Sequence, residues 1–198
     1  MVERSNRILA RLRLSTSEAQ RRALAALPMW LRAEVAGLRL GIVHGDAQSL
    51  AGWGFAQEHL REAEHRDAVR GWFERAGVDA FACTHTCLPV FQALRAAGGE
   101  GQRWIFNNGA TGMPNFAGDA SGLLTRIAAT PIEGAAKRFG VHAGKVFVDA
   151  VAVQVDPGEW RSRFLRQWPS GSDAHASYFD RIVRGPAYRP EEAMRVEG

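Results

Sequence analysis

The chain has 198 residues, 46% of them hydrophobic and 23% charged, which fits one globular domain with a buried core. No apolar run approaches the roughly 18 residues that a membrane-spanning helix needs, and the first seven residues lack the apolar stretch of a secretory signal. We therefore expect a cytoplasmic protein without a membrane association. The two cysteines, Cys83 and Cys87, lie four positions apart in one short segment, which excludes a disulfide framework and favours a reducing compartment.

The formal net charge of +4 comes mostly from arginine. Several arginines lie near the start of the chain: Arg4, Arg7, Arg11, Arg13, Arg21 and Arg22. A basic face of this kind can attract nucleic acid, and the affinity would then fall steeply with salt. The alternative is a solvated helix surface. We favour the helix surface, because no aromatic or glycine residues interleave with the arginines, and we do not expect nucleic acid as a partner.

The first predicted elements are a helix and a hairpin. Ser15 and Glu18 have the spacing of a capping box, which predicts a helix over residues 15–27 that Pro28 stops. Residues 30–35 and 38–43 follow as two strands around Gly37, which permits a turn.

A longer helix is predicted over residues 55–76, and Gly77 closes it. The side chains expected to face the core from this helix are Leu60, Ala63, Val69, Trp72 and Phe73.

In the rest of the chain, predicted strands and helices alternate at first, and strands then predominate. Strands are predicted at 78–83, 104–106, 123–127 and 145–155, helices at 160–168 and 178–183, and residues 88–97 are ambiguous between the two. The fold class is therefore α/β or α+β, with a layered sheet core in a single domain over residues 1–198.

Polar residues follow three of the predicted strands at their carboxyl ends: His44, His85 and Asn107. Loops at strand carboxyl ends are where α/β sheets usually place ligands. Two histidines on neighbouring strands can share one divalent cation, because packing fixes the direction of each ring. Gly45 lets the backbone approach closely, and Asn108 with the glycine after it permits a tight turn.

The segments around these residues resemble the calcineurin-like metallophosphoesterases. The second half of that family has a strand ending in His-Gly, a helix, a strand ending in Gly-His-Thr-His, and a strand ending in Asn-Pro-Gly-Ser. Residues 43–45, 84–87 and 107–110 match these motifs in the same order and with similar spacing. The resemblance spans about residues 4–126, and residues 15–27 resemble the stretch that precedes the His-Gly strand in the family.

This resemblance implies two sheets packed face to face between helices, and a metal-dependent phosphoester hydrolase or phosphatase activity with Mn, Fe or Zn ions. His44 and His85 would bind one metal of a two-metal centre, and Cys87 falls where the family has a histidine ligand of the other. Around these ligands, or on the substrate side, the resemblance places Gly45, Asp46, Thr84, Thr86, Asn107 and Asn108. Asp46 could orient the ring of His44 or have a plain loop role.

The chain departs from the family in two ways. Cys87 replaces the second histidine, and a thiolate suits zinc or iron but not manganese or magnesium. A buried and inert cysteine is the alternative. In addition, the Asp-x-His, Gly-Asp-x-x-Asp and Gly-Asn-His motifs of the first half have no counterpart upstream. A truncated gene model, the choice of start codon, or a separate chain that supplies this half would each explain their absence.

Without these motifs we expect little or no phosphatase activity from the isolated chain. We also expect exposed apolar sheet edges, and therefore a partner chain, an oligomer or poor solubility. A non-catalytic binding or scaffold module that keeps the fold without a complete metal centre is the alternative function.

Other polar residues are expected to be structural. Asp173 and His175 spell Asp-x-His, and Asp119 follows a glycine, but we interpret these as surface turns or helix caps. His59 and His65 are expected to be solvated on the long helix. For Arg126, an ordinary ion pair is favoured over a phosphate contact.

Overall fold

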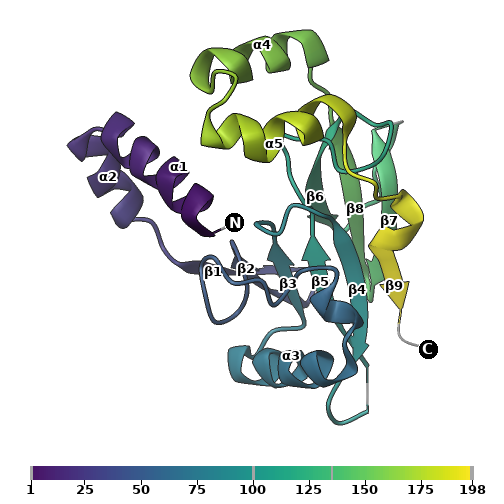
Figure 1. The fold of residues 1–198 in the computed structure, drawn as a ribbon. Helices are drawn as coiled ribbons and strands as arrows, with labels where there is room; N and C mark the ends of the chain where they lie inside the picture. The colour runs from purple at the N-terminus through teal and green to yellow at the C-terminus, as the bar shows by residue number, and fades with distance from the viewer. Residues whose placement is uncertain (1, 100, 135, 197–198) are drawn as a thin grey trace.

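The computed structural model of the protein describes residues 2–99, 101–134 and 136–196, and these form an α+β fold (Figure 1). The helices are α1 (Val2–Ser15), α2 (Glu18–Ala25), α3 (Ala63–Ala76), α4 (Pro157–Gln167) and α5 (Asp173–Arg184), with short 3-10 helices η1 (His59–Arg61) and η2 (Pro190–Ala193). The strands are β1 (Trp30–Val35), β2 (Leu38–Val43), β3 (Ala80–Cys83), β4 (Val90–Arg95), β5 (Gln102–Asn107), β6 (Gly122–Ala128), β7 (Lys137–Ala143), β8 (Val146–Val153) and β9 (Met194–Val196). The predicted fold class, layered sheets flanked by helices, is confirmed.

The larger sheet has six strands in the order β1-β2-β3-β5-β4-β9. Strands β2, β3 and β5 run parallel, so their carboxyl ends lie at the same edge of the sheet. Strand β1 pairs antiparallel with β2 as the predicted hairpin, and β9 adds to β4 in parallel. The predicted segments 38–43, 78–83 and 104–106 therefore correspond to three adjacent parallel strands.

Side chains alternate between the two faces of this sheet, and each face has its own apolar core. On one face, the three-stranded antiparallel sheet β6-β8-β7 packs through a cluster that includes Leu40, Phe91, Trp104, Phe106, Phe139 and Val148. On the other face, α3 packs through a cluster that includes Val69, Phe73, Phe81, Val90 and Ile105. In β5, for example, Trp104 and Phe106 point toward the second sheet and Ile105 points toward α3.

The first helical segment differs from the prediction. Residue Ser15 ends α1 and its hydroxyl donates to the carbonyl of Leu12, instead of capping a helix. The capping box is formed by Ser17 and Gln20 at the start of α2, where each side chain accepts from the other residue's backbone amide. A capping box is therefore present, but it begins at Ser17, two positions later than the predicted Ser15.

The long helix predicted over residues 55–76 is also shorter than expected. After the 3-10 turn η1, Glu62 has extended backbone angles, so the regular helix begins at Ala63, and Ala63 itself is exposed. The other expected core residues of this segment, Leu60, Val69, Trp72 and Phe73, are buried. Gly77 ends α3 in the left-handed conformation at φ 62°, as predicted.

Several later elements were undecided or missed. The ambiguous segment 88–97 contains strand β4, because its side chains are buried against both cores between β5 and β9. Strands β7 and β9 were not predicted. Helices α4 and α5 begin earlier than expected, because the side chains of Asp156 and Ser172 cap their first turns.

The amino-terminal helices carry most of the early arginines on exposed surface, in agreement with the helix-surface interpretation. Helix α1 lies against α5, where Arg7 forms an ion pair of 2.7 Å with Asp173. The guanidinium of Arg11 lies 4.8 Å from the ring centroid of Trp168. Among the described residues, no helix combines the length and the apolar character needed to cross a membrane.

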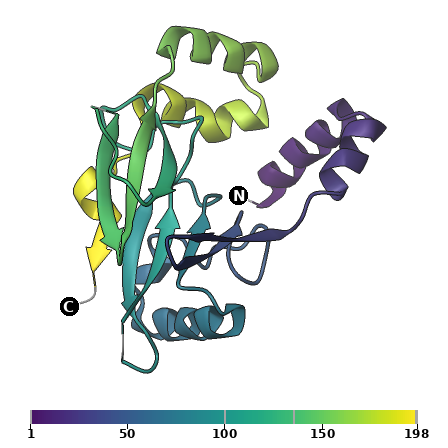
Figure 2. The same cartoon turned by 180° about the vertical axis from the view of Figure 1, so that it is seen from behind.

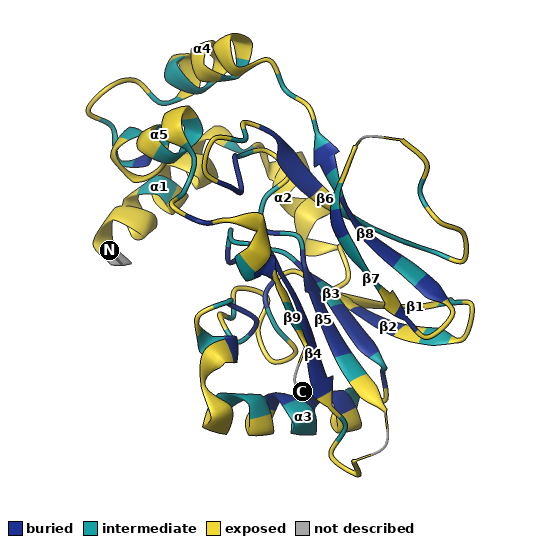
Figure 3. Cartoon of the chain, turned by 90° about the vertical axis from the view of Figure 1, so that its right-hand side faces the viewer, coloured by how far each residue is buried: buried dark blue, intermediate teal, exposed yellow. Residues whose placement is uncertain are grey.

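The hairpin end of the six-stranded sheet is more exposed than the central strands of that sheet (Figures 2 and 3). All residues of β1 except Val35 are exposed, including Trp30 and Leu31 at 59% and 52%. Helix α3 covers β3, β5 and β4, which are largely buried. The expectation of exposed apolar surface at one sheet edge is therefore met at the hairpin.

Candidate metal-binding site

Two histidines meet at the carboxyl ends of the parallel strands β2 and β3. His44 directly follows β2, and His85 lies two residues beyond the end of β3. Because β2 and β3 pair in parallel, the two loops emerge side by side. The Nδ1 atom of His85 lies 3.1 Å from Nε2 of His44, and the ring centroids are 4.9 Å apart. The expected convergence of these two imidazoles is confirmed.

The separation of the two nitrogens is compatible with two chemical states. Two imidazole nitrogens that bind one cation at about 2.0–2.1 Å lie roughly 2.8–3.4 Å apart when the bond angle is about 90–110°. A hydrogen bond between two imidazoles, one donating its N–H to the other, has a similar length. Burial, and then the nearby His44, lower the pKa of His85, which favours the neutral ring that either state uses.

The loop after β3 has an unusual backbone. His85 and Cys87 both have positive φ, at 60° and 67°, although neither is glycine. The hydroxyl of Thr84 donates to the carbonyl of Gly109 at 2.8 Å, and the amide of Thr86 donates to the carbonyl of Thr84 at 2.7 Å. Left-handed conformations of non-glycine residues often cluster at ligand sites, because the surrounding contacts must hold them there.

Cys87 does not join the two histidines as a third donor. Its thiol donates to the carbonyl of His85 at 3.3 Å, and burial raises its pKa, although Arg181 acts in the opposite direction. Because the thiolate is the form that binds metal, this geometry favours the inert interpretation of Cys87. Among the described residues, no group of three or more His, Cys, Asp or Glu side chains could hold a metal ion.

Asp46 has the plain loop role. Its carboxylate accepts hydrogen bonds from the backbone amides of Gln48 and Ser49, both at 2.8 Å, and of Gly54 at 2.9 Å. These bonds shape the loop that follows His44. Gly45 has the expected close backbone approach, since a Cβ atom there would lie 2.5 Å from the amide nitrogen of Gly52.

The two asparagines at the carboxyl end of β5, Asn107 as its last residue and Asn108 directly after it, form hydrogen bonds that support the neighbouring loops. Asn107 is fully buried, and its amide nitrogen donates to the carbonyl of Phe55 at 3.0 Å and to the hydroxyl of Thr86 at 2.7 Å. Asn108 donates to the carbonyl of Leu123 at 2.8 Å. The expected supporting turn is present, and full burial removes Asn107 from the substrate side.

Two residues near the histidines were not identified from the sequence. The indole of Trp53 lies 5.7 Å from the ring of His85, centroid to centroid, and is half exposed. Arg181 of α5 donates to the carbonyl of Cys87 and to that of Pro114, the latter at 3.0 Å. Trp53 could have been noticed as an aromatic residue in a glycine-rich loop after His44, whereas no local signal connects Arg181 to residue 87.

The two downstream acidic motifs are structural, as interpreted. Asp173 is the first residue of α5, where its carboxylate pairs with Arg7. Asp119 pairs with Arg138 at 2.7 Å in a turn before β6. Arg126 has the ordinary ion pair, 3.1 Å from the buried carboxylate of Asp149.

The two histidines of the long segment differ from the prediction. His65 is half-buried, and its Nε2 lies 2.7 Å from the carbonyl of Gly54. His59 precedes α3, and its Nδ1 lies 3.0 Å from the carbonyl of Trp53. Both rings therefore hold the loop that covers His85, instead of being simply solvated.

A cavity of about 450 Å³ opens beside His44, between the hairpin, the loop after β2 and the end of α3. Its walls are largely apolar and include Trp30, Leu31, Val43 and Phe81. The histidine pair thus lies next to an open and mostly hydrophobic hollow on the uncovered end of the sheet.

No protein-family model and no curated protein matches the chain. Among solved structures, the chain is similar to the crystal structure of hypothetical protein PH1004 from Pyrococcus horikoshii OT3, with a TM-score of 0.52 and 15% sequence identity. The match covers 86% of this chain and 56% of that one, so this chain spans little more than half the length of the protein it resembles. At this identity, the similarity concerns the fold alone.

Proposed function

We propose that this chain carries part of a metal-dependent phosphoester hydrolase centre, in which His44 and His85 bind one divalent cation. The observation that supports the proposal is the 3.1 Å separation of their ring nitrogens at the carboxyl ends of two parallel strands. The resemblance of the surrounding motifs to the calcineurin-like metallophosphoesterases supplies the reaction class.

The donors fit a cation only in part. Two neutral imidazoles suit zinc or iron, but a stable site needs at least one more protein ligand, and Cys87 is turned to its own loop. In a complete centre, the bound metals lower the pKa of a water molecule and neutralise phosphoryl oxygens. The residues of this chain would hold the two rings in place, and a complete centre would need ligands beyond those that the described residues supply.

Metal binding by calorimetry tests the proposal. We expect weak binding of Zn²⁺ to the isolated chain, reduced by about tenfold or more in His44→Ala and in His85→Ala, because loss of even a supporting group has an effect of that size. The matched control is His142→Ala, which removes an exposed imidazole from β7. Binding that is absent, or that is unchanged in both site variants, would contradict the proposal.

An assay of phosphodiesterase activity tests separately whether the metal centre is incomplete in the isolated chain. With Mn²⁺, Zn²⁺ or Fe²⁺ and an activated aryl phosphate diester, we expect little or no turnover. Turnover that disappears in His85→Ala but persists in His175→Ala would overturn the inactivity and still support the site.

A non-catalytic module is the second candidate. The observation that favours it is the missing third donor among the described residues, together with a His44–His85 contact that a hydrogen bond alone explains. This candidate predicts no divalent-ion binding that depends on either histidine, so the same calorimetry separates the two.

A further inference from the structure

Strand β1 forms an edge of the six-stranded sheet that is long, regularly paired with β2 and exposed. It is six residues long, pairs with β2 on one side only, and is exposed along its length except at Val35. Proteins usually protect such edges by making them short, bulged or covered, because the free backbone groups can pair with another strand. The opposite edge, β9, has only three residues.

The hairpin turn determines which backbone groups of β1 are free. Ala36 and Gly37 form a two-residue turn with φ angles of 48° and 87°, as in a type I′ turn. In such a hairpin the flanking pair, Val35 and Leu38, exchanges hydrogen bonds, and the pattern alternates along the strand. The N–H and C=O groups of Arg32 and Glu34 therefore point outward, away from β2.

The sequence of β1 is complementary to itself, and we propose that a second copy of this chain pairs antiparallel with β1 about a two-fold axis at Ala33. In this register, Arg32 lies opposite Glu34 of the second copy, and the two residues exchange backbone hydrogen bonds. Leu31 lies opposite Val35 of the second copy on the other face. Because of the two-fold symmetry, the Arg32–Glu34 pair and the Leu31–Val35 pair each occur twice across the interface.

The charges of the strand are available for this pairing. Within the described residues, Glu34 forms no ion pair, and Arg39 opposite it already donates to both carboxylate oxygens of Asp79, at 2.8 and 2.7 Å. Arg32 donates one N–H to the carbonyl of Ala76, at 2.6 Å, which leaves its other donors for an acidic partner. A cross-strand pair of opposite charges stabilises a sheet, and like charges in the same place destabilise it.

The apolar face of the hairpin gains from the same contact. Leu31 is 52% exposed, and Ile42, directly across from it on β2, is 37% exposed. Pairing would extend the six-stranded sheet across the two-fold axis and place a second apolar surface beside these side chains. The second copy is favoured over an unrelated strand because the Arg-x-Glu pattern matches itself in this register.

The test uses charge reversal and charge exchange, with oligomeric state measured by sedimentation. We expect a wild-type dimer, with a dissociation constant raised about tenfold or more in Arg32→Glu and in Glu34→Arg, because each variant places like charges opposite each other in both pairs. The double variant Arg32→Glu/Glu34→Arg restores opposite charges and should restore the dimer. Glu133→Arg is the control, since it makes the same change of charge in an exposed loop.

A cross-link tests the register directly. At a two-fold axis through Ala33, the two Ala33 residues form a non-hydrogen-bonded pair with Cα atoms about 4.5 Å apart, which is within the range of a disulfide. In a Cys87→Ser background, Ala33→Cys should form a covalent dimer on mild oxidation, and Glu133→Cys should not.

A monomeric wild type at high concentration would overturn the proposal. So would a dimer that neither single reversal weakens, or one that the exchange variant fails to restore while thermal unfolding shows that the variant is folded.

Discussion

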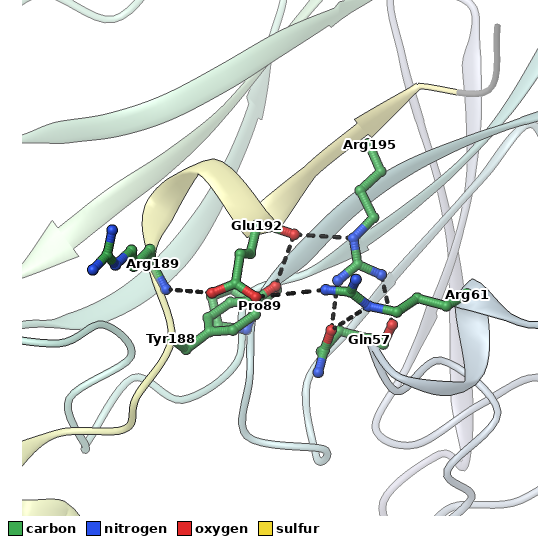
Figure 4. Close-up of polar contacts among 7 residues, drawn as sticks. All are labelled: Gln57, Arg61, Pro89, Tyr188, Arg189, Glu192 and Arg195. Carbon is green, nitrogen blue, oxygen red and sulfur yellow. Dashed lines mark hydrogen bonds and ion pairs between the residues drawn. The ribbon is translucent and has the colours of Figure 1, made fainter.

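The two edges of the six-stranded sheet are built in opposite ways. At the β9 edge, the last strand is short and is held by a polar network that joins it to distant segments (Figure 4). The phenol of Tyr188 lies 2.9 Å from the carbonyl of Pro89 and 3.0 Å from that of Glu192. Arg195 donates to the carbonyl of Gln57 at 2.6 Å. At this edge, contacts with distant segments of the chain hold the last strand in place.

The β1 edge shows no comparable network among the described residues. Strand β1 is exposed, and the ion pair of Arg39 with Asp79 anchors the hairpin close to its turn. The cavity beside His44 and the uncovered Trp30 and Leu31 lie at this same end. The difference indicates that stability is concentrated toward β4 and β5, while the end that carries the histidine pair is left accessible to another polypeptide.

The largest expected effect is the difference between core truncations at the two ends. Phe73→Ala, under β3 and β5, should lower the free energy of unfolding by about 3–5 kcal/mol, because the side chain is fully buried. Leu31→Ala, on the open edge, should change it by less than about 0.5 kcal/mol in the monomer. Urea denaturation at low protein concentration measures both. Equal losses would show that the hairpin end is more tightly packed than its exposure indicates.

At the β9 edge, removal of the hydroxyl of Tyr188 should destabilise the protein. Tyr188→Phe should lower the free energy of unfolding by about 1–2 kcal/mol at neutral pH, because buried carbonyl groups lose their donor. Burial raises the pKa of Tyr188 to about 12. The wild type therefore keeps this stability below the unfolded pKa of about 10 and loses it as the pH rises toward 12.

Unfolding of both proteins across this alkaline range provides the check. The difference between wild type and Tyr188→Phe should shrink as the pH rises, whereas the variant Tyr178→Phe, on α5, should follow the wild type. A difference that stays constant up to pH 12 would contradict the assignment.

A smaller effect than that of Tyr188→Phe is expected at the ion pair of Arg39 with Asp79, which anchors the hairpin at the open edge. The hydrogen bonds from Arg39 lower the pKa of Asp79, although burial acts in the opposite direction. The resulting stability is present above the unfolded pKa of about 3.9 and is lost as the pH falls through the folded value. Asp79→Asn should therefore be less stable than the wild type at pH 7 and nearly equal to it at the acid end, as measured by chemical denaturation. Parallel acid profiles would exclude a role of this ion pair.

The histidine site shows which features of a site can be predicted from local sequence and which cannot. The convergence of His44 and His85 follows from short apolar strands that are each followed by a histidine within two residues, since parallel strands deliver their carboxyl ends to one edge. The left-handed backbone of His85 and Cys87 has no signature in the residue types, because contacts from Gly109 and Arg181 hold it in place.

The amino-acid sequence by itself determined the hairpin, the strand segments of β2, β3 and β5, the closure of α3 at Gly77 and a layered α/β or α+β class, because apolar periodicity and glycine conformations are local properties. Tertiary structure alone decided that segment 88–97 is a strand, that Glu62 interrupts the long helix, and that Cys87 faces its own loop. These outcomes depend on contacts between residues far apart in the chain, whose free energies outweigh weak local preferences.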